Sequence, residues 1–422
     1  MTAGRFGQVF IWRWAQAGSA ALAVGLLAFT ALAPVTPANA EEPIRIGELN
    51  SYNRFAAFTV PYRQGWQLAV EELNAAGGVR GRPLEIISRD DGGTTGDAVR
   101  IAEELTSREN VSFLFGTFLS NIGLAVSDFA NRRRTLFIAA EPLTDALTMA
   151  NFNRYTFRLR PNTYMQTAML VEAAKASGAQ RWAVVAPNYE YGQSAAKNFS
   201  ILMPEAIEGA EIVVEQFPAL GKIDAGATVA AIERTNPDAI FSVLFGSDLA
   251  KFVREGTTRG LFEDRTVVSL LTGEPEWLLP LGAEAPEGWI VTGYPWEQIE
   301  EPKHKAFVEA YIARWDDTPR LGSLLGYQII KLIAAMIETS MDVHPDDPLA
   351  TDSLVDVLEG LTVDALVGDM TVRALDHQTT LGTWVGTLTV VDGEGRMKDW
   401  YYADGADFMP SEAAVAAARG NN

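Results

Sequence analysis

The side chains that could do chemistry in this 422-residue chain are its carboxylates and three histidines, because the sequence contains no cysteine. His304 lies at a charged helix start and His344 in a Pro/Asp loop, so we expect both at the surface. His377, in Asp376-His377-Gln378, is better placed, but we interpret it as a turn residue that bonds backbone. There is no Gly-x-Ser-x-Gly nucleophile elbow, no His-x-x-x-His zinc pair and no phosphate-binding glycine loop after the first strand. We therefore predict no catalytic residue, no metal and no cofactor.

Carboxylates leave one enzymatic alternative. A facing pair could make the chain an exported hydrolase, which would turn a ligand over rather than bind it stoichiometrically. Asp90-Asp91 follows a predicted strand and could hold a metal. Such a pair more often caps the Gly-rich turn into the next helix, and this is the interpretation we favour.

The elements that must position these residues alternate along the chain. Short apolar strands are predicted at Ile44–Leu49, Leu84–Ser88, Val111–Phe115 and Leu136–Ala139. Amphipathic helices are predicted between them, at Pro61–Ala76, Thr95–Arg108 and Asn121–Arg132. The same rhythm restarts after a connecting strand at Tyr155–Leu159. Strands that alternate with helices predict the α/β class, here as two doubly wound parallel-sheet lobes with helices on both faces.

The last third of the chain differs from the rest. Long helical patterns at 303–315 and 321–340 precede three alternating segments that predict antiparallel strands, at Met370–Ala374, Trp384–Val391 and Met397–Tyr401.

Charge and the N-terminus restrict the cellular setting. Against 34 Lys+Arg stand 54 Asp+Glu, a formal charge of −20, with no basic run, so nucleic acid is not an expected partner. Residues 1–40 are predicted to be a signal peptide: Arg5 and Arg13, an apolar stretch at 15–33, then Ala38-Asn39-Ala40. A lipid anchor needs a cysteine after the signal, so we expect a protein free in the periplasm.

Open parallel sheets bind ligands beyond the carboxyl ends of their strands. Ser120 and Asn121 follow the third strand at a helix start, where backbone N–H groups favour an anion, although Ser120 could be only a helix cap. Tyr191 and Glu274 also follow strands, and could be a packing residue and a solvated loop acid respectively. These four residues are our first candidates for a ligand site.

Several runs resemble the opening of leucine/isoleucine/valine-type periplasmic binding proteins of ABC transporters: Ile44-Arg45-Ile46-Gly47, the run 65–70, and Leu73–Arg82 with its Asn-Ala-Ala-Gly-Gly-Val core. The resemblance continues through Tyr191-Gly192, Glu287-Gly288, Gly326-Tyr327 and 373–378, and so covers nearly the whole chain after residue 40.

This resemblance implies a type I fold whose lobes are joined by a three-segment hinge, with crossings near Pro161, Pro295 and Thr371. The first lobe would hold 44–160 and 295–370, the second 161–294 and 371–410, and 411–422 would be a flexible tail. It also implies a monomer that closes over a small solute and docks on an inner-membrane ABC permease with its ATPases.

The family's pocket falls on identifiable positions of this chain. The resemblance places the carboxylate-binding serine at Ser120, the ammonium-binding acid at Glu274, and aromatic contacts at Phe58, Tyr191 and Phe245. Two positions depart from the family pattern: Glu141 replaces a small residue, and Leu143 replaces a threonine that bonds the ligand carboxylate.

These departures leave the ligand open. An amino acid or a similar amphipathic solute is the first hypothesis. An amide, a urea-like compound or an aromatic acid is the second, supported by Leu143, Tyr189, Tyr191, Trp277 and Trp296. An exported ligand sensor is the third hypothesis.

Overall fold

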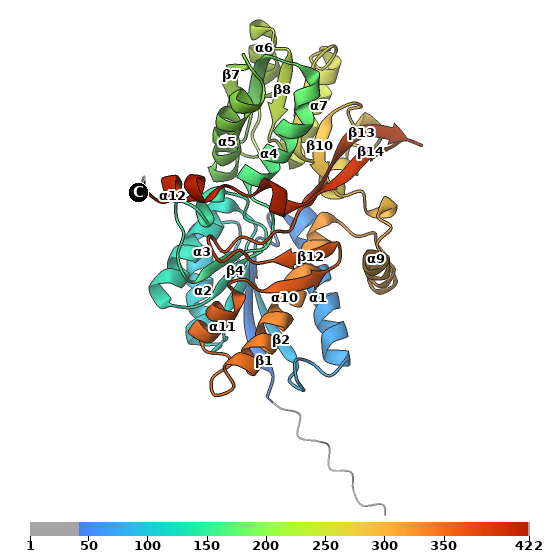
Figure 1. The fold of residues 1–422 in the computed structure, drawn as a ribbon. Coiled ribbons are helices and arrows are strands. Elements are labelled where there is room, and N and C mark those ends of the chain that lie inside the picture. Colours follow the sequence, from blue (N-terminus) through green and yellow to red (C-terminus); the bar gives the residue numbers. More distant parts are fainter. Residues whose placement is uncertain (1–41, 421–422) are drawn as a thin grey trace, which may run out of the picture. The chain divides into compact units, whose positions relative to one another are not determined.

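A five-stranded parallel sheet forms the first lobe, in the order β2-β1-β3-β4-β5 (Figure 1). The structure is a computed structural model that describes residues 42–420, and the predicted signal peptide at 1–40 lies outside the described residues. The strands are β1 (Ile44–Asn50), β2 (Leu84–Asp90), β3 (Leu114–Gly116), β4 (Phe137–Ala139) and β5 (Thr156–Arg158). Because all five run the same way, the segments that leave their carboxyl ends meet at one edge.

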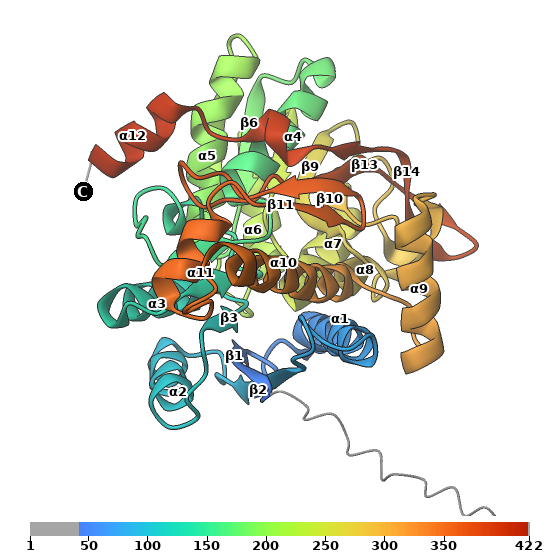
Figure 2. The same ribbon diagram turned by 60° about the horizontal axis from the view of Figure 1, so that its bottom comes forward.

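The helices of this lobe come from two distant parts of the chain: α1 (Ala56–Ala75), α2 (Thr95–Ser107), α3 (Ser120–Arg133), and then α9 (Pro302–Trp315), α10 (Leu321–Val343) and α11 (Thr351–Leu358). Helices α1 and α10 lie side by side (Figure 2). Glycines allow this approach, since a Cβ on Gly65 would lie 2.0 Å from the carbonyl oxygen of Ser323. Helix α1 begins at Ala56, earlier than the predicted Pro61, which lies inside it.

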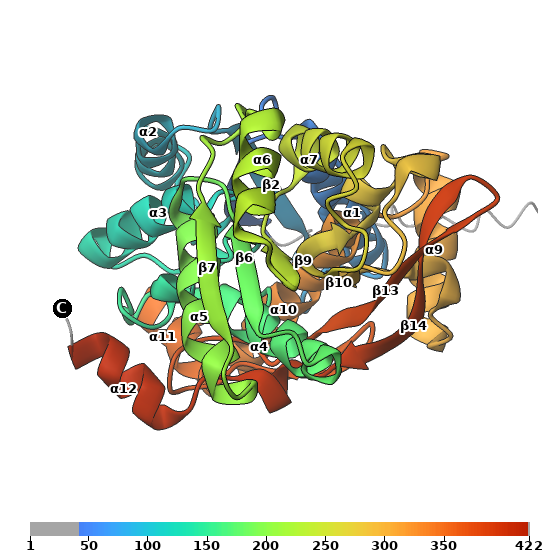
Figure 3. The same ribbon diagram turned by 90° about the horizontal axis from the view of Figure 1, so that it is seen from above.

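A seven-stranded sheet forms the second lobe, in the order β14-β13-β10-β9-β8-β6-β7 (Figure 3). Five strands are parallel, namely β6 (Arg181–Val185), β7 (Glu211–Gln216), β8 (Ala239–Ser242), β9 (Thr266–Gly273) and β10 (Ile290–Gly293). Strands β13 (Thr383–Val391) and β14 (Glu394–Ala403) join as an antiparallel hairpin, as their alternation predicts. The second lobe is therefore a mixed sheet rather than a purely parallel one.

The helices of the second lobe are α4 (Thr163–Ala174), α5 (Glu190–Ala206), α6 (Ala225–Thr235), α7 (Gly246–Thr258) and the short α8 (Pro275–Leu278). Two of them begin at a polar cap: the side chain of Asn162 accepts from Met165 N, and that of Asp224 from Ala227 N. These caps place the helix starts at the ends of the preceding connections.

The end of the chain is helical, which corrects the prediction of a flexible tail at 411–422. Helix α12 (Glu412–Gly420) buries Val415, and the Arg419 guanidinium donates to the carbonyl of Leu375 and lies 3.8 Å from the ring centroid of Phe152. One apolar residue and one arginine are enough to anchor a segment whose composition alone suggested fraying. Residues 421–422 lie outside the described range.

Three connections link the lobes. The first runs from β5 to α4 through Arg160 and the second from β10 to α9. The third leaves the first lobe later than the predicted Thr371. Residue Gln378 bridges to Arg158 beside β5, and Val372 to Thr379, so the chain crosses at 380–382. The predicted strand Met370–Ala374 is instead β12 (Gly368–Thr371), which pairs with β11 (Thr362–Ala365).

The histidines show how far burial can be misjudged from charge patterns. His304 was expected at the surface, but it is buried and its Nε2 lies 2.6 Å from the hydroxyl of Tyr294, because it faces inward between exposed Lys303 and Lys305. Burial lowers its pKa to about 4. His377 is a left-handed turn residue (φ 57°) whose Nδ1 lies 3.0 Å from the carbonyl of Thr156, which confirms the prediction.

Within residues 42–420, helix α10 is the one helix long and apolar enough to cross a membrane by length and composition. Of its most apolar window, 72% is buried, much of it against α1, as expected for a core helix.

Candidate ligand-binding site

A cavity with about 300 Å³ of atom-free space lies between the carboxyl ends of the two sheets. Its walls come from α1, the segments that follow β3, β4, β5, β6, β8 and β9, and helix α8. The lining residues are Phe58, Phe118, Ser120, Glu141, Leu143, Arg160, Tyr189, Tyr191, Phe245, Leu271, Glu274 and Trp277. This is the place at which small-molecule sites form in α/β proteins.

The structure brings nearly all of the candidate residues together. Those that line the cavity are Phe58, Ser120, Glu141, Leu143, Tyr191, Phe245 and Glu274. Asn121 does not: it is exposed, because the next residue on a helix points away from the face that Ser120 presents. Trp296, cited in support of an aromatic ligand, lines a different cavity beside Gln298 and Met397.

Ser120 begins helix α3 and is 2% exposed. Its Oγ accepts from the backbone N–H groups of Leu143 and Thr144, at 3.2 and 3.1 Å. Both contacts are donated to Ser120, so its own hydroxyl proton is left to donate to an acceptor in the cavity. The first N–H groups of a helix also have no intrahelical partner, which favours a partly negative oxygen at this end.

Aromatic rings form most of the wall. Phe58 of the first lobe stacks on Trp277 of the second, with ring centroids 6.1 Å apart and planes inclined by 14°. Tyr191 and Phe245 meet edge to face at 5.9 Å, and Tyr189 lies 6.0 Å from Tyr191. The hydroxyl of Tyr191 is buried without a hydrogen-bond partner among the described residues. Such rings provide flat apolar contact area and at least one polar handle for a ligand.

A buried charge cluster forms the polar end of the cavity, and its centre, Arg160, was not predicted. Arg160 is 2% exposed; its Nη2 pairs with Glu274 Oε1 of the second lobe and its Nη1 lies 3.4 Å from Glu141 Oε2 of the first. Its guanidinium carbon lies 5.4 Å from the ring centroid of Phe58. The same strand-end rule that selected Ser120 could have selected Arg160, which comes two residues after β5.

Burial dominates the electrostatics of this cluster. It raises the pKa of Glu274 to about 8, although Arg160 opposes the shift. It also raises the pKa of Glu141 well above its usual range, again against Arg160. The guanidinium keeps its charge, since the adjacent carboxylates raise its pKa despite its burial. The site therefore stabilises positive charge and disfavours free carboxylates.

Further contacts join the lobes around the cavity. The carboxyl Oε1 of Glu276 in α8 accepts from the backbone N–H of Gly322 in α10 at 2.7 Å. The hydroxyl of Thr144 donates to Glu190 Oε1 at 2.7 Å. Together with the Arg160–Glu274 pair, these bonds hold the lobes closed over the cavity.

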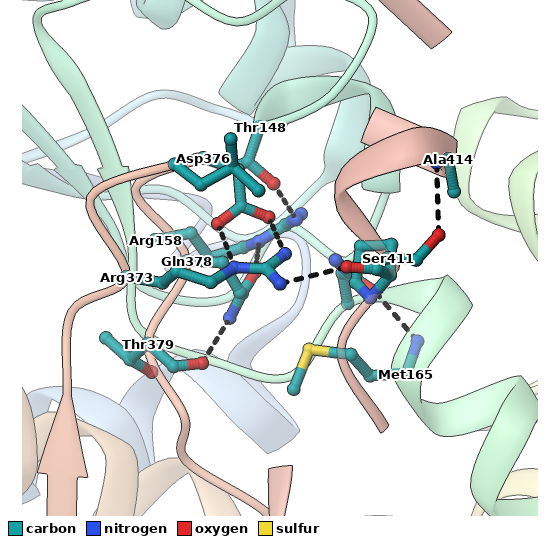
Figure 4. A network of polar contacts seen from close by, with 12 residues as sticks. Thr148, Arg158, Met165, Arg373, Asp376, Gln378, Thr379, Ser411 and Ala414 are labelled. Carbon is teal, nitrogen blue, oxygen red and sulfur yellow. Dashed lines mark hydrogen bonds and ion pairs between the residues drawn. The ribbon is translucent and has the colours of Figure 1, made fainter. Parts of the chain in front are cut away.

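A polar network at the hinge positions the loop that carries Leu143 and Thr144. Its members Arg158, Thr148 and Gln378 are drawn in Figure 4. The buried guanidinium of Arg158 donates to the carbonyl of Thr144, to Thr148 Oγ1 at 2.7 Å and to Gln378 Oε1 at 2.6 Å. The Gln378 amide in turn donates to the carbonyl of Arg160 at 3.0 Å. The first and third crossings are thus tied to each other and to the wall of the cavity.

No metal site is evident in the part of the chain that the structure describes, where no group of three or more His, Cys, Asp or Glu side chains could hold an ion. The Asp90-Asp91 pair caps the following turn, as favoured from the sequence: Asp90 Oδ1 accepts from Gly92 N at 2.9 Å and Asp91 Oδ1 from Gly93 N at 2.8 Å.

Comparisons with known proteins agree with this architecture. The model of the periplasmic binding protein family matches residues 43–394, so the chain belongs to that family. Its members are solute-binding proteins, which implies a small-molecule ligand and a periplasmic location.

One similar sequence is the Leu/Ile/Val-binding protein homolog 7 from Brucella suis, which is 27% identical over 72% of this chain and 78% of that protein. Another is a leucine-, isoleucine-, valine-, threonine- and alanine-binding protein from Pseudomonas aeruginosa, which is 24% identical over 67% of this chain and 74% of that protein. Similar structures include a Brucella ovis binding protein of the latter name in its closed conformation, with a TM-score of 0.76, 20% identity and coverage of 87% and 97%. An ABC transporter solute-binding protein from Rhodopseudomonas palustris in complex with 3,4-dihydroxybenzoic acid has a TM-score of 0.75, 19% identity and coverage of 86% and 98%. The structural likenesses establish the fold.

Proposed function

We propose that this protein is the substrate-binding component of an ABC importer, which closes over an amino acid or a similar small amphipathic solute and delivers it to an inner-membrane permease and its ATPases. One observation carries the proposal: a buried cavity between two lobes, with aromatic walls, a serine hydroxyl at one helix start and a charged cluster. In this proposal the site binds its solute and releases it chemically unchanged.

Closure explains how such a site would respond to its solute. Phe58 and Glu141 belong to the first lobe, and Glu274 and Trp277 to the second. A solute that touches all four makes contacts that exist only when the lobes meet, and this differential contact shifts the population toward the closed form. A permease that recognises both lobes at once would then bind the loaded protein.

A second candidate is a solute with an aromatic or amide body. Leu143 supplies an apolar contact where the leucine/isoleucine/valine-type binding proteins that this chain resembles have a hydroxyl. The aromatic wall is extended by Tyr189, Phe118 and Trp277. Proteins of similar fold carry names or ligands of both kinds, amino acids and hydroxylated benzoates.

Export by cleavage within residues 1–40, and a monomeric state that leaves the docking face of each lobe free, complete the proposal. N-terminal sequencing of the protein recovered from the periplasm, and its mass in solution, check these two points directly.

A thermal-shift screen tests the proposal. Residues 41–422, which form a compact unit of their own, are screened against amino acids, amides, amines and aromatic acids. A solute at one hundred times its dissociation constant should add about 2.7 kcal/mol of stability. Stabilisation by one chemical class supports the proposal, whereas the absence of any shift across the panel contradicts it.

A further inference from the structure

Two buried carboxyl groups line the cavity, and one of them is better satisfied than the other. Glu274 uses Oε1 for Arg160 and Oε2 for the indole N–H of Trp277 at 3.2 Å. Glu141 makes one longer contact, from Oε2 to Arg160, and its Oε1 has no hydrogen-bond partner within residues 42–420. Glu141 is 1% exposed. A buried carboxyl oxygen without a partner destabilises the protein, so Glu141 Oε1 is the cavity atom that would gain most from a hydrogen-bond donor.

The charge balance points the same way. Of the residues that line the cavity in the described structure, Arg160 is the one basic side chain, and it faces the two carboxyls of Glu141 and Glu274. Glu276 lies close enough behind them to act on both. A positive group placed here is attracted by every acid of the cluster, while an anion is attracted by Arg160 alone, whose Nη1 and Nη2 already contact carboxylates.

The part of the cavity wall around Ser120 and Leu143 is poor in groups that would hold a carboxylate. Leu143 contributes an alkyl side chain, and the Oγ of Ser120 already accepts two backbone N–H bonds, which leaves one hydroxyl proton. One neutral donor suffices for a carbonyl or hydroxyl oxygen but neutralises no charge.

We infer that the solute carries a net positive charge and that its hydrogen-donating head, an ammonium or amidinium group, is bound by Glu141 rather than by Glu274, whose two carboxyl oxygens already bond Arg160 and Trp277. The inference rests on the proposed function and names its substrate class. The aromatic walls then accept an apolar body beside this head.

Three compounds of nearly the same shape and different charge test this inference by calorimetric titration into residues 41–422: benzylamine, benzamide and benzoate. We expect benzylamine to bind at least about tenfold more tightly than benzoate. Glu141→Gln should then weaken benzylamine by about 10- to 100-fold, the usual worth of a hydrogen bond to a charged group. Glu276→Gln is the matched control, because it removes a carboxyl of the same cluster that does not line the cavity and keeps an acceptor for Gly322 N. Its effect should be the smaller of the two.

The outcomes separate the inference from the proposed function. Tighter binding of benzoate or benzamide, or of leucine over leucinamide, would overturn the inference and leave a binding protein for acids, amides or zwitterions. An unchanged affinity of Glu141→Gln for benzylamine would also overturn it. Failure of all solutes, amino acids included, would overturn the proposed function itself.

Discussion

Closure of the lobes should depend on pH through Glu274, and the size of the effect follows from its burial. We expect this side chain to be hydrated in an open cleft, with the ordinary pKa of 4.5, whereas burial raises the pKa to about 8 in the closed form. The groups that face it are Arg160, Glu141, Glu276 and Tyr191. Because the closed form binds the proton more tightly, closing takes up a proton, and lowering the pH favours closure.

The two pKa values give the magnitude. Ionised Glu274 makes closing less favourable by about 3 kcal/mol at pH 7 and by about 1 kcal/mol at pH 5, since one pKa unit corresponds to about 1.4 kcal/mol. Moving from pH 7 to pH 5 should therefore favour the closed form by about 2 kcal/mol, or more than about tenfold in the ratio of closed to open protein. Burial raises the pKa of Glu141 too, so its contribution has the same sign.

The absence of cysteine from the sequence makes the assay direct. Thr95→Cys and Lys222→Cys place one label on an exposed position of each lobe, and a spin–spin distance measurement reports the closed fraction. We expect more closed protein at pH 5 than at pH 7, and no such change in the double variant Glu141→Gln/Glu274→Gln. Equal closed fractions at both pH values, or opening at pH 5, would refute the reasoning.

Glu48→Gln should raise the free energy of unfolding by about 3 kcal/mol at pH 7 and hardly at pH 4. Burial raises the pKa of this β1 carboxyl to about 8, so the folded protein loses stability relative to the unfolded chain as the pH rises above 4.5. Equal gains at both pH values in urea unfolding would argue against this. Ser120→Ala should weaken a solute with an acceptor oxygen by about 1–2 kcal/mol in calorimetry, while exposed Asn121→Ala should have no effect; similar losses in both would remove Ser120 from the site. The protein should lose about 3 kcal/mol of stability between pH 6.5 and pH 4, because burial lowers the pKa of folded His304 to about 4 and the unfolded chain binds the histidine proton at higher pH. His304→Gln should abolish this loss. Thermal unfolding across the pH range measures the loss, and an undiminished loss in the variant would contradict the prediction.

The sequence predicted the two sheets and much of the cavity for a physical reason. Strand and helix alternation requires parallel pairing, and parallel strands deliver the residues that follow them to one edge. Ser120, Tyr191 and Glu274 all follow strands, so their convergence needed no knowledge of side-chain packing, whereas Phe245 was assigned only by the family resemblance. The prediction for Asn121 was wrong because strand ends select a whole segment, whereas only one face of a helix start can line a cavity.

The strand-end rule could have selected Arg160 as a residue of the site, but local pattern could not predict its ion-pair partners. Its backbone belongs to a crossing whose path is set by pairing with residues 377–379, far along the chain, and by the Gln378 amide on its carbonyl. Its partners Glu141 and Glu274 come from different lobes. The late third crossing, the anchored helix α12 and the burial of His304 were missed for the same reason, since each depends on contacts between distant segments.

Native mass spectrometry of residues 41–422 with a stabilising solute tests the central claim most directly. We expect one solute molecule per chain, recovered chemically unchanged. The double variant Glu141→Gln/Tyr191→Ala should lose the complex. Conversion of the solute, or equal retention by the variant, would contradict a binding protein that closes over its ligand at this cavity.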